Sequence, residues 1–86
     1  MILRVYCVRD RATIAFGNPM YLFSDGQAIR SFSDEVNRVA DDNAIFKHPD
    51  DYDLYFLGEF DNSTGMFATS VPEMILSGKS ARVRSN

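Results

Sequence analysis

The stretch SDGQAIRSFSDEVNRVA, residues 24–40, carries the clearest secondary-structure signal in the 86-residue chain. Ser24 and Gln27 fit a capping box, in which the Ser24 hydroxyl accepts a bond from the Gln27 amide and the Gln27 side chain reaches back to Ser24. Beyond this cap, apolar side chains recur at spacings of three and four, at Ala28, Ile29, Phe32, Val36, Val39 and Ala40. The pattern predicts an amphipathic helix of about four turns.

The residues before this helix predict a β-hairpin. Residues 1–9 (MILRVYCVR) alternate with a period of two and are rich in β-branched and aromatic side chains, which is typical of a strand. The next two residues are predicted to form a turn, and residues 12–16 the second strand. Residues 17–19 (GNP) then end the pairing, because Pro19 lacks an amide donor. A short apolar stretch, residues 20–23, leads into the helix.

The residues after the helix begin with a predicted loop, residues 44–51 (AIFKHPDD). Residues 53–60 (DLYFLGEF) follow as a predicted strand. Neither face of this strand is polar, so we expect it to be central in the sheet or covered on its second face by a partner.

A second hairpin is predicted to follow that strand. Residues 61–65 form its tight loop, in which Gly65 is suited to a positive φ. The returning strand is placed at residues 66–70, because Pro72 is expected to end regular pairing. Residues 73–77 fit either a strand or a short helix.

Together these elements predict an α+β fold. The predicted order is ββαββ, a small antiparallel sheet with one amphipathic helix packed on a face. A chain of this length makes a single domain, which we place at residues 1–78. Residues 79–86 contain three basic residues and no acid, and are expected to be a basic, flexible C-terminal tail.

The composition is that of a folded globular domain, with 45% hydrophobic, 13% aromatic and 24% charged residues. The single cysteine, Cys7, excludes an internal disulfide framework. No stretch resembles a signal peptide or reaches the about 18–20 apolar residues of a membrane span. We therefore expect a small, soluble, intracellular domain that has no membrane partner.

Residues that carry enzymatic or metal chemistry are sparse. His48 is the only histidine, so a zinc site would need three carboxylates around it, which is an unusual ligand set. Asp50, Asp51 and Asp53 lack the spacing of a calcium loop, and the five glycines are too scattered for a phosphate-binding loop. The sequence therefore predicts no enzyme, no cofactor and no metal site.

Charge is distributed unevenly along the chain, whose net charge is −3. Residues 1–11 hold three arginines against one aspartate, whereas residues 12–78 hold eleven acids against three bases. The basic ends supply the candidate nucleic-acid contacts, which are Arg4, Arg9, Arg11, Lys79, Arg82 and Arg84. The candidate rings for base stacking, worth about 1–3 kcal/mol per base, are Tyr6, Tyr52, Tyr55 and Phe67.

These aromatic and basic residues also admit a plainer interpretation. An acidic chain is a poor partner for phosphates, and aromatic residues on strands are more often core or dimer contacts. The predicted sheet carries more apolar surface than one helix covers. This surplus fits either a homodimer or a base-stacking surface, and the homodimer is favoured.

Two blocks of the sequence resemble the small non-structural protein of the gokushoviruses, which are tailless Microviridae phages with circular single-stranded DNA. Residues 18–32 (NPMYLFSDGQAIRSF) resemble that family's P-F-x-x-x-N-D-G-x-A-x-R-x-F segment, with Ser24 in place of the usual asparagine. Residues 36–37 (VN) and 47–65 (KHPDDYDLYFLGEFDNSTG) resemble its VN … HPxDYxLYxIGxFDxxTG block. The resemblance covers residues 1–76 and leaves the basic tail unmatched.

The resemblance implies a non-enzymatic, non-structural accessory protein made in the cytoplasm of the infected host bacterium. By genome position, that protein is likened to factors acting in single-stranded DNA synthesis and packaging. The implied partners are phage replication or capsid proteins, or a host protein. Direct binding of single-stranded DNA, by sheet aromatics and the basic termini, is the alternative.

The residues shared with the family motif are expected to shape the scaffold and not to form a reactive site. They start and anchor the predicted helix and form two turns. These motif residues are Ser24, Asp25, Gly26, Phe32, Pro49 and Gly65.

Overall fold

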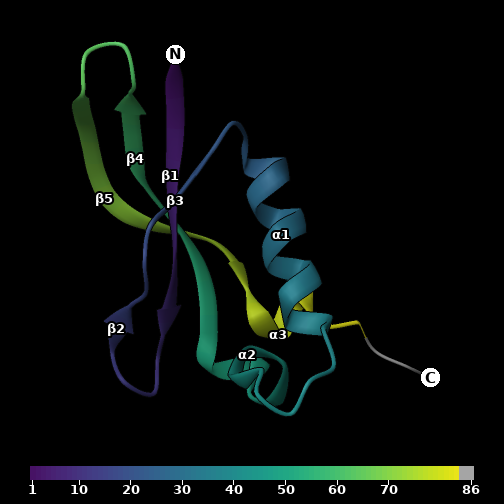
Figure 1. Ribbon diagram of the computed structural model, residues 1–86. Coiled ribbons are helices and arrows are strands. Elements are labelled where there is room, and N and C mark those ends of the chain that lie inside the picture. Colours follow the sequence, from purple (N-terminus) through teal and green to yellow (C-terminus); the bar gives the residue numbers. More distant parts are fainter. Residues whose placement is uncertain (84–86) are drawn as a thin grey trace.

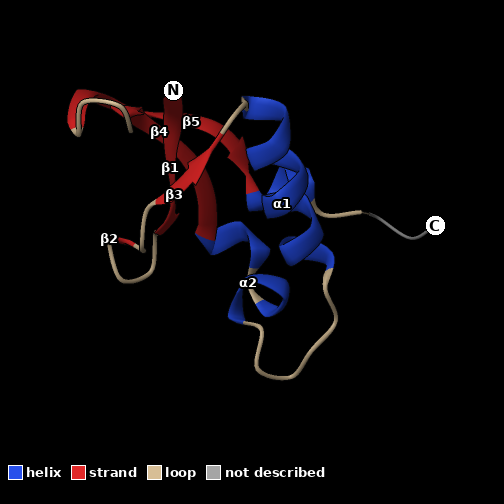
Figure 2. Cartoon of the chain, turned by 45° about the horizontal axis from the view of Figure 1, so that its top comes forward, coloured by secondary structure: helices blue, strands red, loops and turns tan. Residues whose placement is uncertain are grey.

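The computed structural model describes residues 1–83, in which a curled sheet lies on one side and the helices on the other (Figures 1 and 2). In chain order its elements are β1 (Ile2–Asp10), β2 (Ala15–Phe16), β3 (Met20–Leu22), α1 (Asp25–Asn37), α2 (Ala44–Lys47), a 3₁₀ turn (Pro49–Asp51), β4 (Tyr52–Asp61), β5 (Met66–Ser77) and α3 (Gly78–Ala81). The predicted α+β class is confirmed.

The sheet is antiparallel and has the strand order β2-β1-β4-β5, with β3 also pairing with β1. β1 and β4 pair along their whole lengths, from Ile2 opposite Asp61 to Asp10 opposite Tyr52. These two strands are therefore central, which agrees with the expectation for an apolar strand near residues 53–60.

Helix α1 packs on one face of the sheet, and the core lies between the two layers. The buried cluster consists of Tyr6, Ala28, Phe32, Val36 and Leu54, each with no more than 3% of its surface exposed. Each large apolar side chain buried in this way contributes about 1.5–3 kcal/mol. The three helical members have the spacing that the sequence pattern predicted.

Helix α1 ends at Asn37, three residues before the predicted end at Ala40. The Asn43 side-chain amide donates to the carbonyls of Glu35 and Arg38, at 2.9 Å each, and so satisfies carbonyls that the end of the helix leaves free. Val39 lies beyond this stop and is 79% exposed, so it is not part of the apolar helix face.

The first predicted hairpin differs from the structure in its second strand. The Asp10 carboxylate accepts from the amides of Ala12 and Thr13, which forms a turn and shortens the expected strand 12–16 to β2. Residues 20–22 form the additional strand β3, because Met20 and Leu22 are half-buried while Tyr21 is exposed. The order ββαββ therefore gains one strand.

The returning strand of the second hairpin is longer than predicted. β5 continues through Pro72 to Ser77, because residues 70–72 bulge opposite the single residue Leu57 of β4. A bulge tolerates a residue without an amide donor. This resolves residues 73–77 as strand.

Residues 44–51, predicted as a loop, form α2 and the 3₁₀ turn. Asn43 caps α2, since its side-chain oxygen accepts from the amides of Ile45 and Phe46. This capping asparagine was the available signal for a helix start.

The packed structure extends beyond the domain end predicted at residue 78. Gly78 is buried, and the Ala81 carbonyl accepts a bond from the Asn37 side chain at 3.0 Å. The Val83 amide donates to the same asparagine side chain at 2.8 Å. The first part of the predicted tail is therefore held against α1, and the rest of it, residues 84–86, lies outside the described residues.

The β4–β5 hairpin, together with the start of β1, projects past the end of α1 (Figure 1). We call this projection, residues 58–69 with residues 2–4, the arm. Gly58 lies at the base of the arm and has a φ of +138°. The position that a Cβ would take at Gly58 is filled by the Ala68 carbonyl oxygen and the Thr69 Cα. Only glycine fits this position without strain.

We expect Gly58→Ala to lower the free energy of unfolding by about 2–4 kcal/mol, because the new Cβ meets the β5 backbone at an unfavourable φ. Gly65→Ala is the matched control: Gly65 has a φ of +76° in the hairpin loop, but nothing lies within 4 Å of its Cβ position. It should lose only about 1 kcal/mol. Urea denaturation measures both, and equal losses would contradict the close approach at Gly58.

Candidate functional site

Within residues 1–83 the sheet has one face that no helix covers, and we call it the open face. Tyr6, Val8 and Leu54 point to α1, so their neighbours along each strand point the other way. Cross-strand pairs place Cys7 with Tyr55, Val5 with Gly58 and Phe60 with Phe67 on that side. The open face also carries Phe16 and Tyr21, which lie at the outer edge of β1.

Three aromatic rings form a cluster at the arm end of the open face. The Phe60 ring centroid lies 4.7 Å from that of Phe67 and 5.8 Å from that of Tyr21. Tyr21 is 46% exposed and Phe67 is 56% exposed. We call Tyr21, Phe60 and Phe67 the arm cluster; it presents aromatic surface to the solvent.

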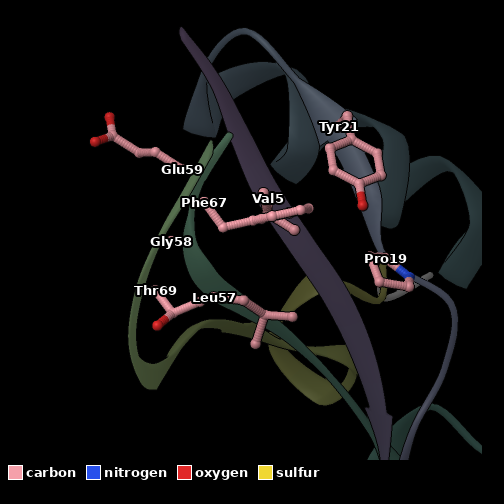
Figure 3. Close-up of a pocket in the computed structure, with 8 residues that line it drawn as sticks. All are labelled: Val5, Pro19, Tyr21, Leu57, Gly58, Glu59, Phe67 and Thr69. Atoms are coloured by element: carbon pink, nitrogen blue, oxygen red, sulfur yellow. The ribbon is translucent and has the colours of Figure 1, made fainter. Parts of the chain in front are cut away.

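A cavity of about 250 Å³ opens beside the arm cluster (Figure 3). Its lining comes from β1, the β2–β3 connection, β3, β4 and β5, and consists of Val5, Pro19, Tyr21, Leu57, Gly58, Glu59, Phe67 and Thr69. The only charged lining residue is Glu59, whose carboxylate points away from the apolar side chains in Figure 3. Such a lining suits an apolar or aromatic side chain and not a phosphate.

A second aromatic pair lies at the other end of the open face. The rings of Phe16 and Tyr55 meet edge to face, with centroids 5.3 Å apart. The Arg9 guanidinium carbon lies 5.8 Å from the centroid of Phe16. We call Phe16 and Tyr55 the β2 pair. Of the predicted basic contacts within residues 1–83, Arg9 is the one that lies over an open-face ring.

Arg4 lies on the helix side of the sheet, and its guanidinium is already bonded to groups of the same chain. Its Nε donates to the Asp25 carboxylate at 3.0 Å and to the Tyr6 hydroxyl at 2.9 Å, and its guanidinium lies 4.1 Å from the Phe56 ring centroid. The Tyr6 hydroxyl also donates to Asp25. Arg4 therefore joins the sheet to the first turn of α1.

Arg11 is also occupied, by a buried carboxylate. Its Nε and Nη2 donate to the two oxygens of Asp53, at 2.6 and 3.2 Å. Asp53 is only 1% exposed, so loss of Arg11 would leave a buried charge without its partner. The hydrogen bond and charge of Asp53 raise the pKa of Arg11. The sequence alone does not reveal this pair, because the two residues lie 42 positions apart.

The C-terminal basic residues do not lie on the open face. The Arg82 Nη1 donates to the Phe46 carbonyl at 2.6 Å, and its guanidinium lies 4.1 Å from the Phe46 ring centroid. Lys79 is exposed on α3. Arg84 lies outside the described residues. The predicted set of nucleic-acid contacts is therefore dispersed over several surfaces.

Two of the rings predicted to stack bases are not available for stacking. Tyr6 is fully buried and Tyr52 packs against the core, so only Tyr55 and Phe67 of that set lie on the open face. The alternation of side chains along β1 predicts two faces, but it does not show which of the two is buried. The packing of α1 decides it, because the helix covers the side of Tyr6 and Val8.

The motif residues lie where a scaffold role places them. The Ser24 hydroxyl accepts from the Gln27 amide at 3.2 Å, although the Gln27 side chain reaches the Phe23 amide and not that of Ser24. Asp25 and Gly26 begin α1, whose core contact Phe32 is 3% exposed. Pro49 starts the 3₁₀ turn and Gly65 closes the β4–β5 loop.

Residues 1–83 contain no group of three or more His, Cys, Asp and Glu side chains able to hold a metal ion. Cys7 is buried, and burial raises the pKa of its thiol, which donates to the Gly17 carbonyl at 3.0 Å. A buried thiol of this kind is unreactive. No helix in the described part is long and apolar enough to cross a bilayer.

Comparison with known proteins places this small α+β chain in a family of bacteriophage proteins. Residues 3–81 match the family described as Phage ORF5 protein, and the chain belongs to that family. No curated protein and no solved structure matches the chain. The chain is thus a phage protein, and its site has to be argued from its own geometry.

We expect Tyr6→Phe to lower the free energy of unfolding by about 1–2 kcal/mol at pH 7, because the variant loses the hydrogen bond to a partly exposed carboxylate. The Tyr6 hydroxyl, followed by Arg4, holds the pKa of Asp25 below its ordinary value. This stabilisation is therefore present above the ordinary carboxylate pKa and is lost as the pH falls through the lowered one. Urea denaturation at neutral pH and at about pH 2.5 should show the difference shrinking in acid.

Tyr52→Phe is the matched control for this experiment. The hydroxyl of Tyr52 makes no hydrogen bond within the described residues, so its removal should change stability by less than about 0.5 kcal/mol at either pH. A Tyr6→Phe loss that stays the same in acid would contradict the role of Asp25.

Proposed function

We propose that this phage protein is a non-enzymatic accessory protein of a gokushovirus-type phage. In this proposal it assists replication or packaging of the single-stranded DNA genome through protein–protein contacts in the cytoplasm of the host bacterium. The open face is the observation that carries the proposal, because it combines exposed aromatic rings with an apolar cavity.

The chemistry of the open face supports a protein partner. Contact surfaces between proteins are enriched in aromatic residues and depleted of charge at their centres, and their anchors fill pockets. The arm cluster and its cavity have this character. Contiguous apolar patches of this kind on a small protein mark interaction sites.

The charges of the molecule favour protein over nucleic acid. Arg4, Arg11 and Arg82 bind groups within the chain, and the net charge is −3. Affinity for a nucleic acid rests on cations that are free to displace counterions from phosphates. The occupied arginines supply few of these.

The proposed place in the phage life cycle rests on sequence. The family match gives a phage protein, and the blocks at residues 18–32 and 47–65 resemble the gokushovirus non-structural protein. In the structure these blocks form β3, the first part of α1, β4 and the hairpin loop, and β3 and β4 carry Tyr21 and Phe60 of the arm cluster.

Affinity purification from infected cells tests this function. A tagged wild-type chain should recover a phage replication or capsid protein, and Phe67→Glu should reduce that recovery at least about tenfold, because it places a charge in the arm cluster. Val39→Glu is the matched control, since Val39 is 79% exposed and lies on the helix side. Recovery of neither protein class, or equal recovery by both variants, would refute the proposal.

Direct binding of single-stranded DNA is the second candidate, favoured by the β2 pair with Arg9. An aromatic pair beside a guanidinium is a recurring arrangement for stacking bases and holding their backbone. The candidate therefore predicts binding at this end of the open face and not at the C-terminal basic residues.

Fluorescence anisotropy of a labelled oligothymidine at two salt concentrations tests this candidate. If it holds, Phe16→Ala should weaken binding and Arg9→Ala should lower the salt slope by about one unit. Arg82→Ala, whose guanidinium is held by Phe46, should change the slope much less. Absence of binding at low salt would exclude the candidate.

A further inference from the structure

We propose that the open face is covered by a second copy of this chain, in a two-fold symmetric dimer whose two sheets pack face to face. The inference deepens the proposed function and rests on it in one respect only, that the open face binds protein. It leaves α1 and the helical side of each chain on the outside of the dimer.

The charge pattern of the open face favours a copy of itself. In a two-fold contact the same patch meets itself, so any net charge at its centre is repelled by its own copy. The arm end of this face is formed by Tyr21, Phe60 and Phe67, with Val5 and Leu57 beside them, and none of these residues is charged. At its far end Asp53 is neutralised by Arg11, and Arg9 beside Phe16 adds one positive charge. A face near neutrality in a chain of net charge −3 fits self-association.

The size of the open face is close to what a stable dimer needs. β1 has nine residues, and three further strand positions lie beside it in the sheet. Such a surface spans roughly 30 by 19 Å, or about 570 Å² in projection. Protruding side chains increase the accessible area above the projection, towards the about 800 Å² per partner of a standard interface.

The arm cluster exposes aromatic surface that another protein layer would bury. Sheets of globular proteins pack against other layers, and within residues 1–83 the helices cover only the face opposite to the arm cluster. The arm rings Phe60 and Phe67 therefore have no helix of the described residues above them. A second sheet at about 10 Å, in aligned packing, supplies that layer.

Edge-to-edge pairing of two sheets is a poorer route to a dimer. β5 forms one edge, but it bulges at residues 70–72 and contains Pro72, which has no amide donor; the other edge consists of the short strands β2 and β3. Bulges and prolines on edge strands are the devices that block such pairing. The face, and not the edge, is therefore the surface on which two copies meet.

Sedimentation equilibrium of the full chain over a range of concentrations tests the dimer. The wild type should reach twice the 9.7 kDa mass of one chain, and Phe67→Glu and Tyr21→Ser should each raise the dimer dissociation constant at least about tenfold. Val39→Glu and Val71→Glu are matched controls on the helix side and on the β5 bulge, and both should remain dimeric. Circular dichroism melting shows whether each variant is folded.

Other results would overturn the inference. These are a wild type that stays at 9.7 kDa at every concentration, or a dimer that Val71→Glu disrupts and the face variants do not. If the wild type is a monomer that binds a labelled oligothymidine, and the open-face variants no longer bind it, the open face is a DNA-binding surface instead. If the wild type is a monomer that recovers phage proteins and Phe67→Glu reduces that recovery, the dimer is refuted and the proposed function stands. If the wild type is a dimer that recovers no phage protein, the proposed function is refuted and the dimer stands.

Discussion

The buried phenol of Tyr6 is the constraint on which the rest of the structure depends. Its ring lies between α1 and the sheet with no exposed surface, so its hydroxyl needs a partner within the chain. The Asp25 carboxylate accepts a hydrogen bond from this hydroxyl, and the Arg4 Nε donates to both groups while its guanidinium lies over the Phe56 ring. Because Asp25 is the first residue of α1, this bond fixes where the helix begins along the sheet.

The position of the helix start decides which part of the sheet remains uncovered. α1 runs from Asp25 towards the α3 end of the molecule, so the arm projects in the opposite direction (Figures 1 and 2). The open face follows from the same geometry, since the chain supplies helices to one side only. The open face is thus a consequence of how the helices pack on the other side of the sheet.

Local patterns predicted the elements that local interactions form. The cap at Ser24, the apolar spacing of Ala28, Phe32 and Val36, and the alternation of β1 all reappear in the structure. β3, the continuation of β5 past Pro72 and the Arg11–Asp53 pair were missed, because each depends on a partner distant in sequence. The aromatic surplus predicted an uncovered surface. The rings that form it followed only from the register, in which the loop between Asp61 and Met66 places Phe60 opposite Phe67.

The pairing of β1 with β4 has a consequence for how the chain is made. β1 is synthesised before its partner β4, and it pairs with β4 from Ile2 opposite Asp61 to Asp10 opposite Tyr52. The centre of the sheet therefore cannot form until residues 52–61 have been synthesised. Folds dominated by such distant pairing form slowly, and their apolar strands are exposed in the meantime. Gly78 adds a last step, because its backbone packs against the Pro49 and Tyr52 carbonyls only once β5 is in place. The fold is therefore complete only once residue 78 has been synthesised.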